Sequence, residues 1–283
     1  MTIDYDRLMA LRISATEHTY TPRDTILYAM AIGMAADPLD KSELPFVLEP
    51  VDRVVPTMAT VIAWNDAWLY ETGADMVRLV HGEQRITLHR PLPPAATVVA
   101  STRITDAFDK GPGRGAIVLS ETVIRDRDTG TPLCTTHSTS FARADGGFGG
   151  PAGSGPAPHP IPERKPDAVC DLVTNPDQAL LYRLCGDRNL LHLDPDFAAA
   201  AGFARPILQG LCTYAFACRA VMRAFCDNDP SRIRGFDTRF TSPVFPGETL
   251  RTEMWRDGDV VAYRTRVPER DVVALNNGKA TLR

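Results

Sequence analysis

The sequence predicts an α+β chain of two halves, each of which ends in an antiparallel sheet. Three observations support this prediction. Runs rich in Val, Ile and Thr alternate with turn sequences in both halves. A long amphipathic helical pattern precedes the second set of runs, and a Gly/Pro-rich stretch separates the halves. With 283 residues, the chain is long enough for two domains that each bury a core.

The composition is that of a soluble globular protein. Hydrophobic residues make up 44% of the chain and charged residues 23%, as in soluble globular proteins. The net charge of −4 and the pI near 5.9 argue against nucleic acid as a partner. No apolar run approaches the roughly 20 residues of a transmembrane helix, and the start MTIDYDRLMA lacks the layout of a signal peptide. We therefore expect no nucleic-acid partner and no membrane partner.

The expected compartment is a bacterial cytoplasm. Basic charge comes from 27 Arg and only 4 Lys, a bias found in GC-rich bacterial genomes. The final residues Ala-Thr-Leu-Arg differ from the Ser-Lys-Leu signal for peroxisomes. The cysteines contain no Cys-x-x-Cys pair and lie mostly among apolar neighbours, so we expect buried thiols and no metal site. They are Cys134, Cys170, Cys185, Cys212, Cys218 and Cys226.

A linker is predicted between the halves. The sequence GGFGGPAGSGPAPHP, residues 146–160, has eleven Gly, Pro or Ser among fifteen residues and cannot bury a face. We place the N-terminal half at 1–148, the linker at 149–166 and the C-terminal half at 167–283. The alternative is a long surface loop inside one domain.

Turn sequences separate the predicted strands. In the first half, DKGPGRG (109–115) and RDRDTGTP (125–132) divide an antiparallel meander. In the second half, Asp257-Gly258 is a hairpin signal. The expected strands are 84–88, 96–104, 116–125 and 133–142, then 236–240, 249–256, 260–267 and 272–276.

Three helical patterns precede the second sheet. The first spans 175–186 and the second 194–202, each between an N-terminal capping residue followed by Pro and a terminal Gly. The third begins near Pro206, and its apolar residues form one continuous stripe. A long amphipathic helix followed by an antiparallel sheet suggests a sheet wrapped around a helix. The stripe consists of Leu208, Leu211, Ala215, Cys218, Met222 and Phe225.

The residues best suited to chemistry lie in the loop GDRNLLHLD, residues 186–194, between the first two helices. Asp187 and His192 can transfer a proton near neutral pH, and Asn189 can orient a water or a neighbouring side chain. A loop held by helices at both ends is a rigid place for such groups. The alternative is that these residues make only capping and turn hydrogen bonds, as we expect of Asp194.

The loop and its surroundings resemble a known family. The segment GDRNLLHLDPDFAAAAGFARPILQGL is similar to the signature of the MaoC-like, hydratase 2 family, which runs Gly-Asp-x-Asn-Pro-Leu-His and continues to Pro-Ile-Leu-His-Gly. VHGEQRITLHRPLP, DKGPGRG, CDNDPSR and PVFPGETLRTEMW also resemble the hydratase unit of the peroxisomal multifunctional enzyme of β-oxidation. The resemblance covers roughly residues 70–283.

This resemblance implies a double hotdog, in which two antiparallel sheets are each wrapped around a helix in one chain. It implies (R)-specific hydration of trans-2-enoyl-CoA to (R)-3-hydroxyacyl-CoA, with acyl-CoA as the substrate, no cofactor and a homodimeric assembly. The family's catalytic pair falls on Asp187 and His192, its supporting amide on Asn189 and its backbone oxyanion donor on Gly210. Its substrate and CoA contacts fall on His81, Gly82, Lys110, Arg188, Leu190, Leu191 and Phe240.

Three positions depart from the family pattern. Leu190 replaces a Pro, Arg188 an aromatic residue and Gln209 a His. Since the catalytic groups are intact, we expect these changes to affect the fit of the substrate more than the reaction. Lys110 is the natural partner of a CoA phosphate, and the alternative for it is a solvated turn lysine.

Two other functions stay open at this point. A hotdog thioesterase would aim an activated water at the thioester carbonyl. A non-catalytic subunit would bind acyl-CoA without turnover. The presence of both Asp187 and His192 favours hydration.

An acyl tunnel is predicted in the first half. By analogy with the second half, a long helix is expected within 56–80, but Gly73 and clustered aromatic residues interrupt it. The space left by an interrupted helix would be lined by aromatic and Met side chains and would hold an acyl tail. The alternative is that these side chains complete the core. They are Met58, Trp64, Trp68, Tyr70 and Met76.

Overall fold

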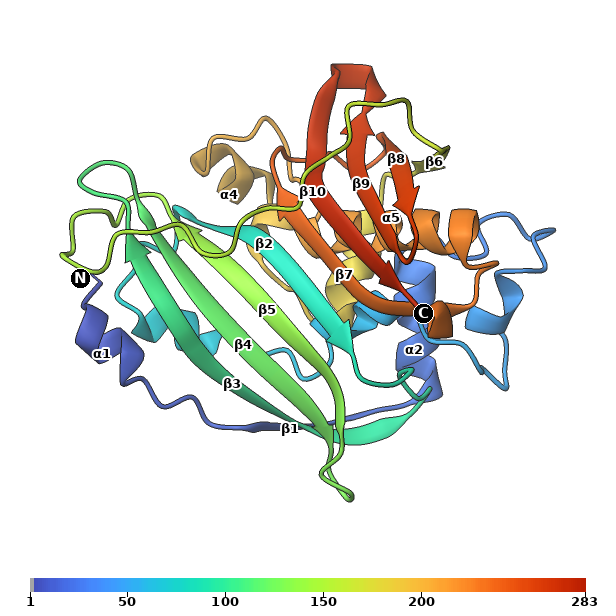
Figure 1. The fold of residues 1–283 in the computed structure, drawn as a ribbon, viewed down its shortest axis with the longest axis horizontal. Helices are drawn as coiled ribbons and strands as arrows, with labels where there is room; N and C mark the ends of the chain where they lie inside the picture. The colour runs from blue at the N-terminus through green and yellow to red at the C-terminus, as the bar shows by residue number, and fades with distance from the viewer. Residues whose placement is uncertain (1–2) are drawn as a thin grey trace.

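Ten antiparallel strands form one continuous sheet in the computed structural model, which describes residues 3–283. The strand order is β1-β3-β4-β5-β2-β7-β10-β9-β8-β6, so the strands of each half lie together (Figure 1). All eight predicted strands are present. The strands are β1 (Thr16–Tyr20), β2 (Leu79–Leu88), β3 (Ala96–Asp109), β4 (Ala116–Asp126), β5 (Pro132–Ala142), β6 (Ala168–Val173), β7 (Ile233–Phe240), β8 (Thr249–Asp257), β9 (Val260–Val267) and β10 (Val272–Leu282).

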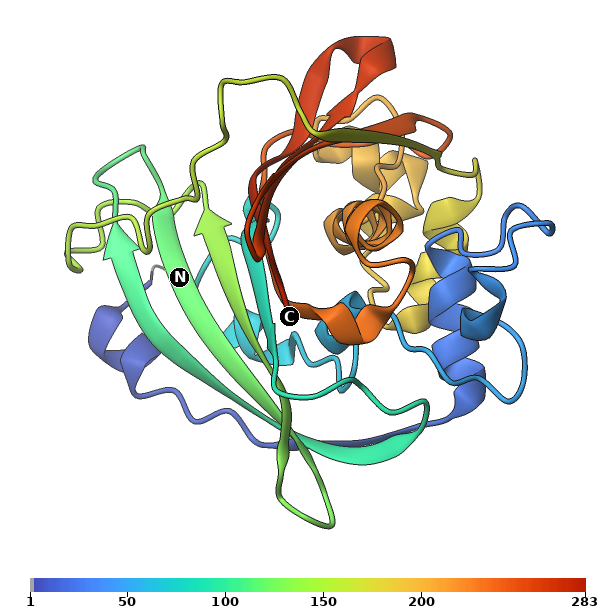
Figure 2. The ribbon, with the colours of Figure 1, turned by 45° about the vertical axis from the view of Figure 1, so that its right-hand side comes forward.

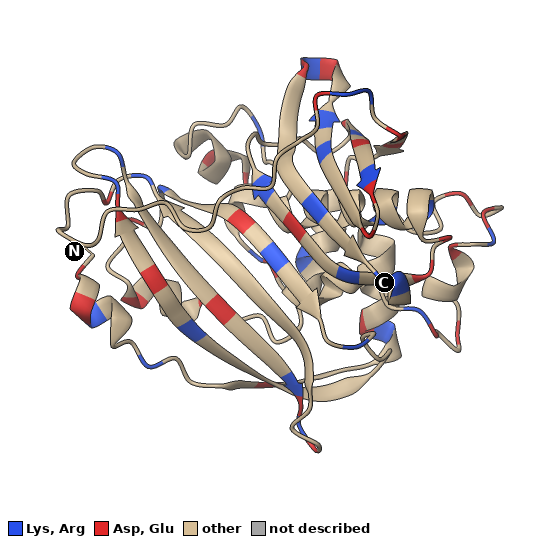
Figure 3. Ribbon diagram, in the orientation of Figure 1, with Lys and Arg blue, Asp and Glu red and all other residues tan. Residues whose placement is uncertain are grey.

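The two predicted sheets are joined edge to edge. β2 and β7 pair antiparallel over five residue pairs, from Glu83 opposite Arg239 to Thr87 opposite Gly235. Acidic and basic residues are mixed along these strands (Figure 3). Glu83 accepts hydrogen bonds from Arg239 at 2.9 and 2.6 Å and from Arg85 at 2.6 Å. Because the pairing satisfies the backbone groups of both strands, neither strand is left as an open sheet edge.

The second half is wrapped around a helix, as predicted. Figure 2 looks along α5 (Gly210–Phe225), which lies inside the curve of the second-half strands. Residues 211–222 are all buried. The helix begins at Gly210 rather than near Pro206, because Leu208 is part of an extended segment whose N–H donates to the Val244 carbonyl at 2.7 Å.

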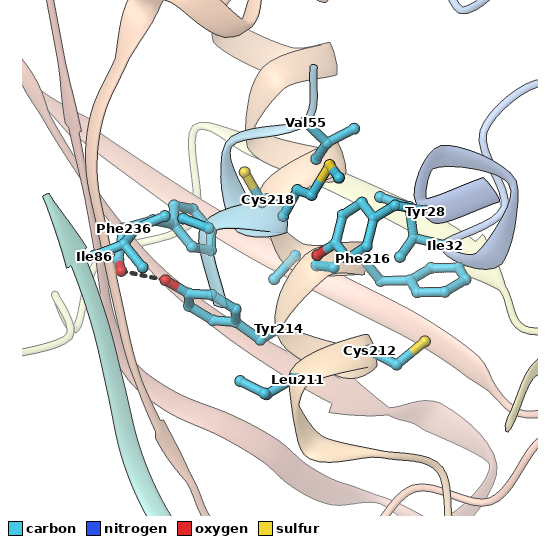
Figure 4. Close-up of a cluster of buried hydrophobic side chains, with 14 of the residues drawn as sticks. Tyr28, Ile32, Val55, Ile86, Leu211, Cys212, Tyr214, Phe216, Cys218 and Phe236 are labelled. Carbon is cyan, nitrogen blue, oxygen red and sulfur yellow. Dashed lines mark hydrogen bonds between the residues drawn. The ribbon is translucent and has the colours of Figure 1, made fainter. Parts of the chain in front are cut away.

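Aromatic side chains fill the space between α5 and the sheet (Figure 4). The Tyr214 hydroxyl donates to the Phe236 carbonyl of β7. The Phe236 ring stacks on Tyr263 of β9 with centroids 4.7 Å apart. All three residues are fully buried, so each contributes roughly 1.5–3 kcal/mol of hydrophobic stabilisation, and the Tyr214 hydroxyl is satisfied where it is buried.

Within residues 3–148, no helix corresponds to the long central helix α5. Residues 56–71 form two short 3₁₀ helices, η2 (Pro56–Thr60) and η3 (Ala67–Glu71), so the predicted interruption is confirmed. The side chains predicted to line a tunnel differ in burial. Met58 is buried in the main core and Trp68 in a small second core, whereas Tyr70 is 71% exposed. Met58 and Trp68 therefore pack in cores, as the alternative predicted, and Tyr70 does not. The use of this region by an acyl tail stays a prediction.

The helix signals before the second sheet were mostly correct. The Asp194 carboxylate accepts from the N–H groups of Asp196 and Phe197 at 2.9 Å and caps α4 (Pro195–Ala200). α3 (Gln178–Tyr182) starts later than expected and continues into the 3₁₀ helix η4 (Arg183–Cys185). The sequence did not predict α1 (Tyr5–Met9), α2 (Pro22–Ala31), β1 or β6. β1 and β6 are short strands at the two edges of the sheet, where one side of the backbone has no partner strand.

Residues 143–167 connect the halves without helix or strand. The Asp109 carboxylate of β3 accepts from the N–H groups of Gly147 at 2.7 Å and Gly149 at 2.8 Å. The Asn277 amide of β10 donates to the His159 carbonyl at 2.8 Å. The segment is therefore tied to both halves, and the boundaries placed at 149 and 166 stay a prediction. All six cysteines are free thiols, as expected, and four are buried.

A buried ion pair fastens α5 to the loop before the 3₁₀ helix η1 (Leu44–Phe46). Arg219 donates to both carboxylate oxygens of Glu43 at 2.8 Å, and the two side chains are only 7% and 1% exposed. Glu43 also accepts from the Ala35 N–H at 2.8 Å. Removing one member of such a pair leaves a buried charge without compensation.

We therefore expect Arg219→Ala to lower the free energy of unfolding by about 3–5 kcal/mol, as measured by urea denaturation. Arg251→Ala is the matched control, because the Arg251–Asp171 pair is 44% and 43% exposed. Its loss should be below about 1 kcal/mol. Equal losses in the two variants would contradict the role given to burial.

Candidate active site

The loop of residues 186–194 lies between η4 and α4 and begins with a conformation that only glycine adopts easily. Gly186 has φ +143°, and a Cβ atom there would lie 3.3 Å from the Cβ of Trp64. Trp64 also packs against the main core. The start of the loop at Gly186 therefore packs against Trp64 of the first half.

Asp187 and His192 face each other in this loop. Asp187 Oδ2 is 3.7 Å from His192 Nε2, and the side chains are only 14% and 9% exposed. His192 Nδ1 lies 2.9 Å from the carbonyl oxygen of Ile207. Because a carbonyl only accepts, we assign the ring hydrogen to Nδ1, so the Nε2 lone pair points toward Asp187.

The environment of Asp187 favours its neutral form. Burial raises the pKa of its carboxyl group, and the charge of Asp66 from the first half adds to this rise. His192 and the backbone N–H of Asn189 oppose the rise. A carboxyl group with a raised pKa accepts a proton more readily than an exposed aspartate does.

Asn189 makes the capping hydrogen bonds that the alternative interpretation predicted. Its Oδ1 accepts from the Leu191 N–H at 3.0 Å and caps the 3₁₀ helix η5 (Leu190–His192). Its own N–H donates to Asp187 Oδ1 at 3.2 Å. Asn189 therefore fixes the turn that carries Asp187 and His192, and the role of its side chain toward a substrate stays a prediction.

Three predicted residues from distant segments meet beside α5. The N–H of Gly210 is at the first turn of the helix, where amides lack intrahelical partners and the dipole favours negative charge. A Cβ atom on Gly210 would lie 3.2 Å from the Phe240 ring. That ring packs on His81 with centroids 4.8 Å apart. Ile207, whose carbonyl contacts His192, is three residues before Gly210.

Gly82 and Lys110 lie at one end of the first-half strands. Gly82 coincides with an irregularity in the β2–β5 register between His81 and Glu83. Lys110 follows β3, and its N–H donates to the Gly115 carbonyl at 3.1 Å. Strand pairing places this turn at the end of the sheet where β2 begins. Lys110 therefore lies at the same end of the sheet as His81.

The remaining predicted contacts line the outside of the loop. Arg188 and Leu190 are exposed, and Leu191 is half-buried. Sequence reasoning missed the roles of Ile207, Trp64 and Asp66. The Pro-Ile-Leu segment contains Ile207, but its part in orienting His192 is a backbone contact that no side-chain pattern reveals.

Comparison with protein families agrees with this geometry. Residues 18–144 match the MFE-2 hydratase 2 N-terminal domain, and residues 158–277 match the MaoC like domain. The enoyl-CoA hydratase ChsH3 of Mycobacterium tuberculosis is 39% identical over 98% of both chains. The chain belongs to the MaoC-like, hydratase 2 family. Another member, the peroxisomal enoyl-CoA hydratase 2 of Arabidopsis thaliana, is 40% identical over 95% of this chain and 93% of its own length.

Solved structures of relatives confirm the predicted double hotdog. The MaoC-like dehydratase of Phytophthora capsici has a TM-score of 0.86 and 31% identity over 99% of this chain and 98% of its own. The peroxisomal multifunctional enzyme type 2 of Drosophila melanogaster has a TM-score of 0.82 and 33% identity over 95% of this chain and 48% of its own. A Mycobacterium tuberculosis protein described as a double hotdog shares the fold at 16% identity, with a TM-score of 0.61 over 99% and 98% of the two chains.

Within residues 3–283, no helix is long and apolar enough to cross a bilayer. In the same part of the chain, no three His, Cys, Asp or Glu side chains cluster as metal ligands do.

The state of His81 predicts a pH dependence of stability. Its Nε2 lies 3.1 Å from the Glu83 carbonyl and 2.9 Å from the Ser138 hydroxyl, and burial lowers the pKa of His81 from 6.5 to about 4. Between these pH values the unfolded chain binds more protons than the folded chain, so the free energy of unfolding should fall as the pH falls. In His81→Gln, the free energy of unfolding measured by urea titration should depend less on pH between 6.5 and about 4. Parallel curves for the two proteins would contradict a neutral, buried His81.

Proposed function

We propose that this chain catalyses the reversible hydration of trans-2-enoyl-CoA to (R)-3-hydroxyacyl-CoA. The observation that carries the proposal is the buried Asp187–His192 pair, with the His192 Nε2 lone pair directed at Asp187. Relatives named enoyl-CoA hydratase match nearly the whole chain, which supports the same chemistry here.

The pair is spaced to hold the reacting water. A separation of 3.7 Å is too long for a direct hydrogen bond, and it suits a water that donates to both atoms from about 2.8 Å. As the water oxygen bonds to the β-carbon, one of its protons passes to the pair. The pair then delivers a proton to the α-carbon, so each turnover leaves the pair in its starting protonation state.

Negative charge develops on the thioester oxygen as the water adds. The N–H of Gly210 at the start of α5 is suited to stabilise that charge. A Cβ atom at this position would make a tight 3.2 Å contact with the Phe240 ring, and glycine allows the closest approach of a thioester to the backbone. One such donor contributes about 3 kcal/mol to transition-state stabilisation.

A single assay separates this function from the alternatives. Incubation with an enoyl-CoA should remove the absorbance of the conjugated thioester, and chiral analysis should identify the (R)-3-hydroxyacyl product. Release of free thiol would instead indicate a thioesterase. Binding without any chemical change would indicate a non-catalytic acyl-CoA subunit.

The catalytic pair gives a direct prediction. Asp187→Asn and His192→Gln should each lower kcat by about 10²- to 10⁴-fold, with smaller effects on KM. Because both groups serve one proton transfer, the double variant should be little worse than the weaker single variant. Near-normal kcat in either single variant, with intact folding by circular dichroism, would refute this mechanism.

The CoA site gives a second prediction. We infer that Lys110 binds a CoA phosphate, because it is a cation in the turn at the end of the sheet where β2 begins. Lys110→Ala should raise KM by a similar factor for every acyl chain and leave kcat nearly unchanged. The difference from the wild type should shrink as salt is added. An effect that depends on acyl length would place Lys110 near the acyl group instead.

We further propose that the chain acts as a homodimer in a bacterial cytoplasm and needs no cofactor. Exposed Met30, Leu180 and Leu184 lie on α2, α3 and η4, which pack together, and apolar surface of this kind supports self-association. Relatives from Mycobacterium tuberculosis support a bacterial setting. Sedimentation equilibrium would test whether the chain is a dimer. An activity assay after exhaustive dialysis against a chelator would test whether it needs a cofactor. Fractionation of the source cells would test whether it is cytoplasmic.

A further inference from the structure

Gln209 is a buried polar residue next to the proposed oxyanion donor Gly210. It directly precedes Gly210 and is completely shielded from solvent. Its Nε2 donates to the Ala179 carbonyl of α3 at 3.1 Å. Its Oε1 has no hydrogen-bond partner among residues 3–283.

Stability does not explain a glutamine here. Gln209 is the N-terminal capping residue of α5, yet its side chain makes no capping hydrogen bond, and Gln is not a favoured residue at that position. A buried oxygen without a partner costs about 1–3 kcal/mol. An apolar side chain of the same length would avoid that cost.

Unsatisfied polar groups gather around the same place. Five buried side-chain atoms in the described part of the chain lack partners, and three of them belong to Tyr182, Arg183 and Gln209. Burial, with smaller contributions that include the charge of Asp187, raises the pKa of Tyr182. Natural proteins tolerate such groups mainly at functional sites, where stability is traded for geometry.

The Gln209 hydrogen bond connects the two parts of the catalytic machinery. α3 and η4 lead directly into Gly186 and Asp187, and α5 begins with the Gly210 N–H. Within residues 3–283, the bond from Gln209 to Ala179 is the one side-chain hydrogen bond between α3 and the start of α5. This bond therefore joins the segment that leads into Asp187 to the start of α5, in addition to the contact of His192 with the Ile207 carbonyl.

We propose that Gln209 is a positioning residue that sets the distance between the Asp187–His192 pair and the Gly210 N–H, at a cost to the stability of the fold. The proposal rests on the hydration proposed above. Because Gln209 is fully buried, it acts through the backbone of Ala179 and Gly210 and does not touch the substrate.

Gln209→Met tests the proposal, because Met is unbranched, has nearly the same length and has no amide. The variant should lose about 10- to 100-fold in kcat, as small misplacements of catalytic groups do. KM should stay near the wild-type value, since the Gly210 N–H acts in the transition state. The urea midpoint should be unchanged or higher, because the unsatisfied oxygen is gone.

Gln178→Met is the matched control. Gln178 is equally buried and lies on α3, but both ends of its amide are satisfied: Nε2 donates to the Ala31 carbonyl at 2.6 Å, and Oε1 accepts from the Asn175 N–H at 3.0 Å. This variant should have a lower urea midpoint and near-normal kcat per folded molecule. Gln209→His should retain most of the activity, because an imidazole N–H can also donate to the Ala179 carbonyl.

The outcomes separate the two proposals. A wild type without hydratase activity would overturn the proposed function and this inference with it. An active wild type together with normal kcat in Gln209→Met would overturn only the positioning role. A large drop in the urea midpoint of Gln209→Met would also overturn it, because that result would make Gln209 a purely structural residue.

Discussion

The pairing of β2 with β7 is the interaction on which the site depends. Five residue pairs join the halves into one sheet, and His81 on β2 packs on Phe240 of β7 as a result. Phe240 in turn lies against Gly210 at the start of α5. The β2–β7 hydrogen bonds thus fix the first half relative to the start of α5, where the proposed donor Gly210 lies. Residues separated by some 150 positions become neighbours because two strands complete each other's hydrogen bonds.

The loop of residues 186–194, proposed to be catalytic, is held mainly by backbone contacts. The Ile207 carbonyl fixes the ring of His192, and Gly186 permits the close approach of Trp64. Asn189 closes the turn between Asp187 and His192 through hydrogen bonds to neighbouring atoms. The capping interpretation and the catalytic interpretation of this motif are therefore compatible, because the same hydrogen bonds that stabilise the turn also orient the reactive pair.

The three departures from the family pattern fall into two physical groups. Arg188 and Leu190 are exposed residues of the loop, and their contact with a substrate stays a prediction. Gln209 is buried and bonded to another helix, so the expectation of altered substrate fit does not suit it. Burial separates these residues, although the sequence motif presents them together.

The sequence by itself determined the local elements and the chemistry of the loop. Alternating β-branched residues predicted eight strands, Asp194-Pro195 predicted the start of α4, and the Asp-x-Asn-x-x-His pattern with its flanking segments indicated the family. These features depend on residues close together in the sequence. The spacing of apolar residues indicates which face is buried, and capping residues indicate where a helix begins.

Only the tertiary structure decided how these elements meet. It placed Met58 in the main core, joined β2 to β7, and oriented His192 through the Ile207 carbonyl. It also showed that Gln209 has an unsatisfied oxygen. Each of these features depends on side-chain packing or on backbone hydrogen bonds between residues far apart in the chain. Backbone N–H and C=O groups are nearly the same in every residue, so a local pattern of side chains does not predict which of them will pair.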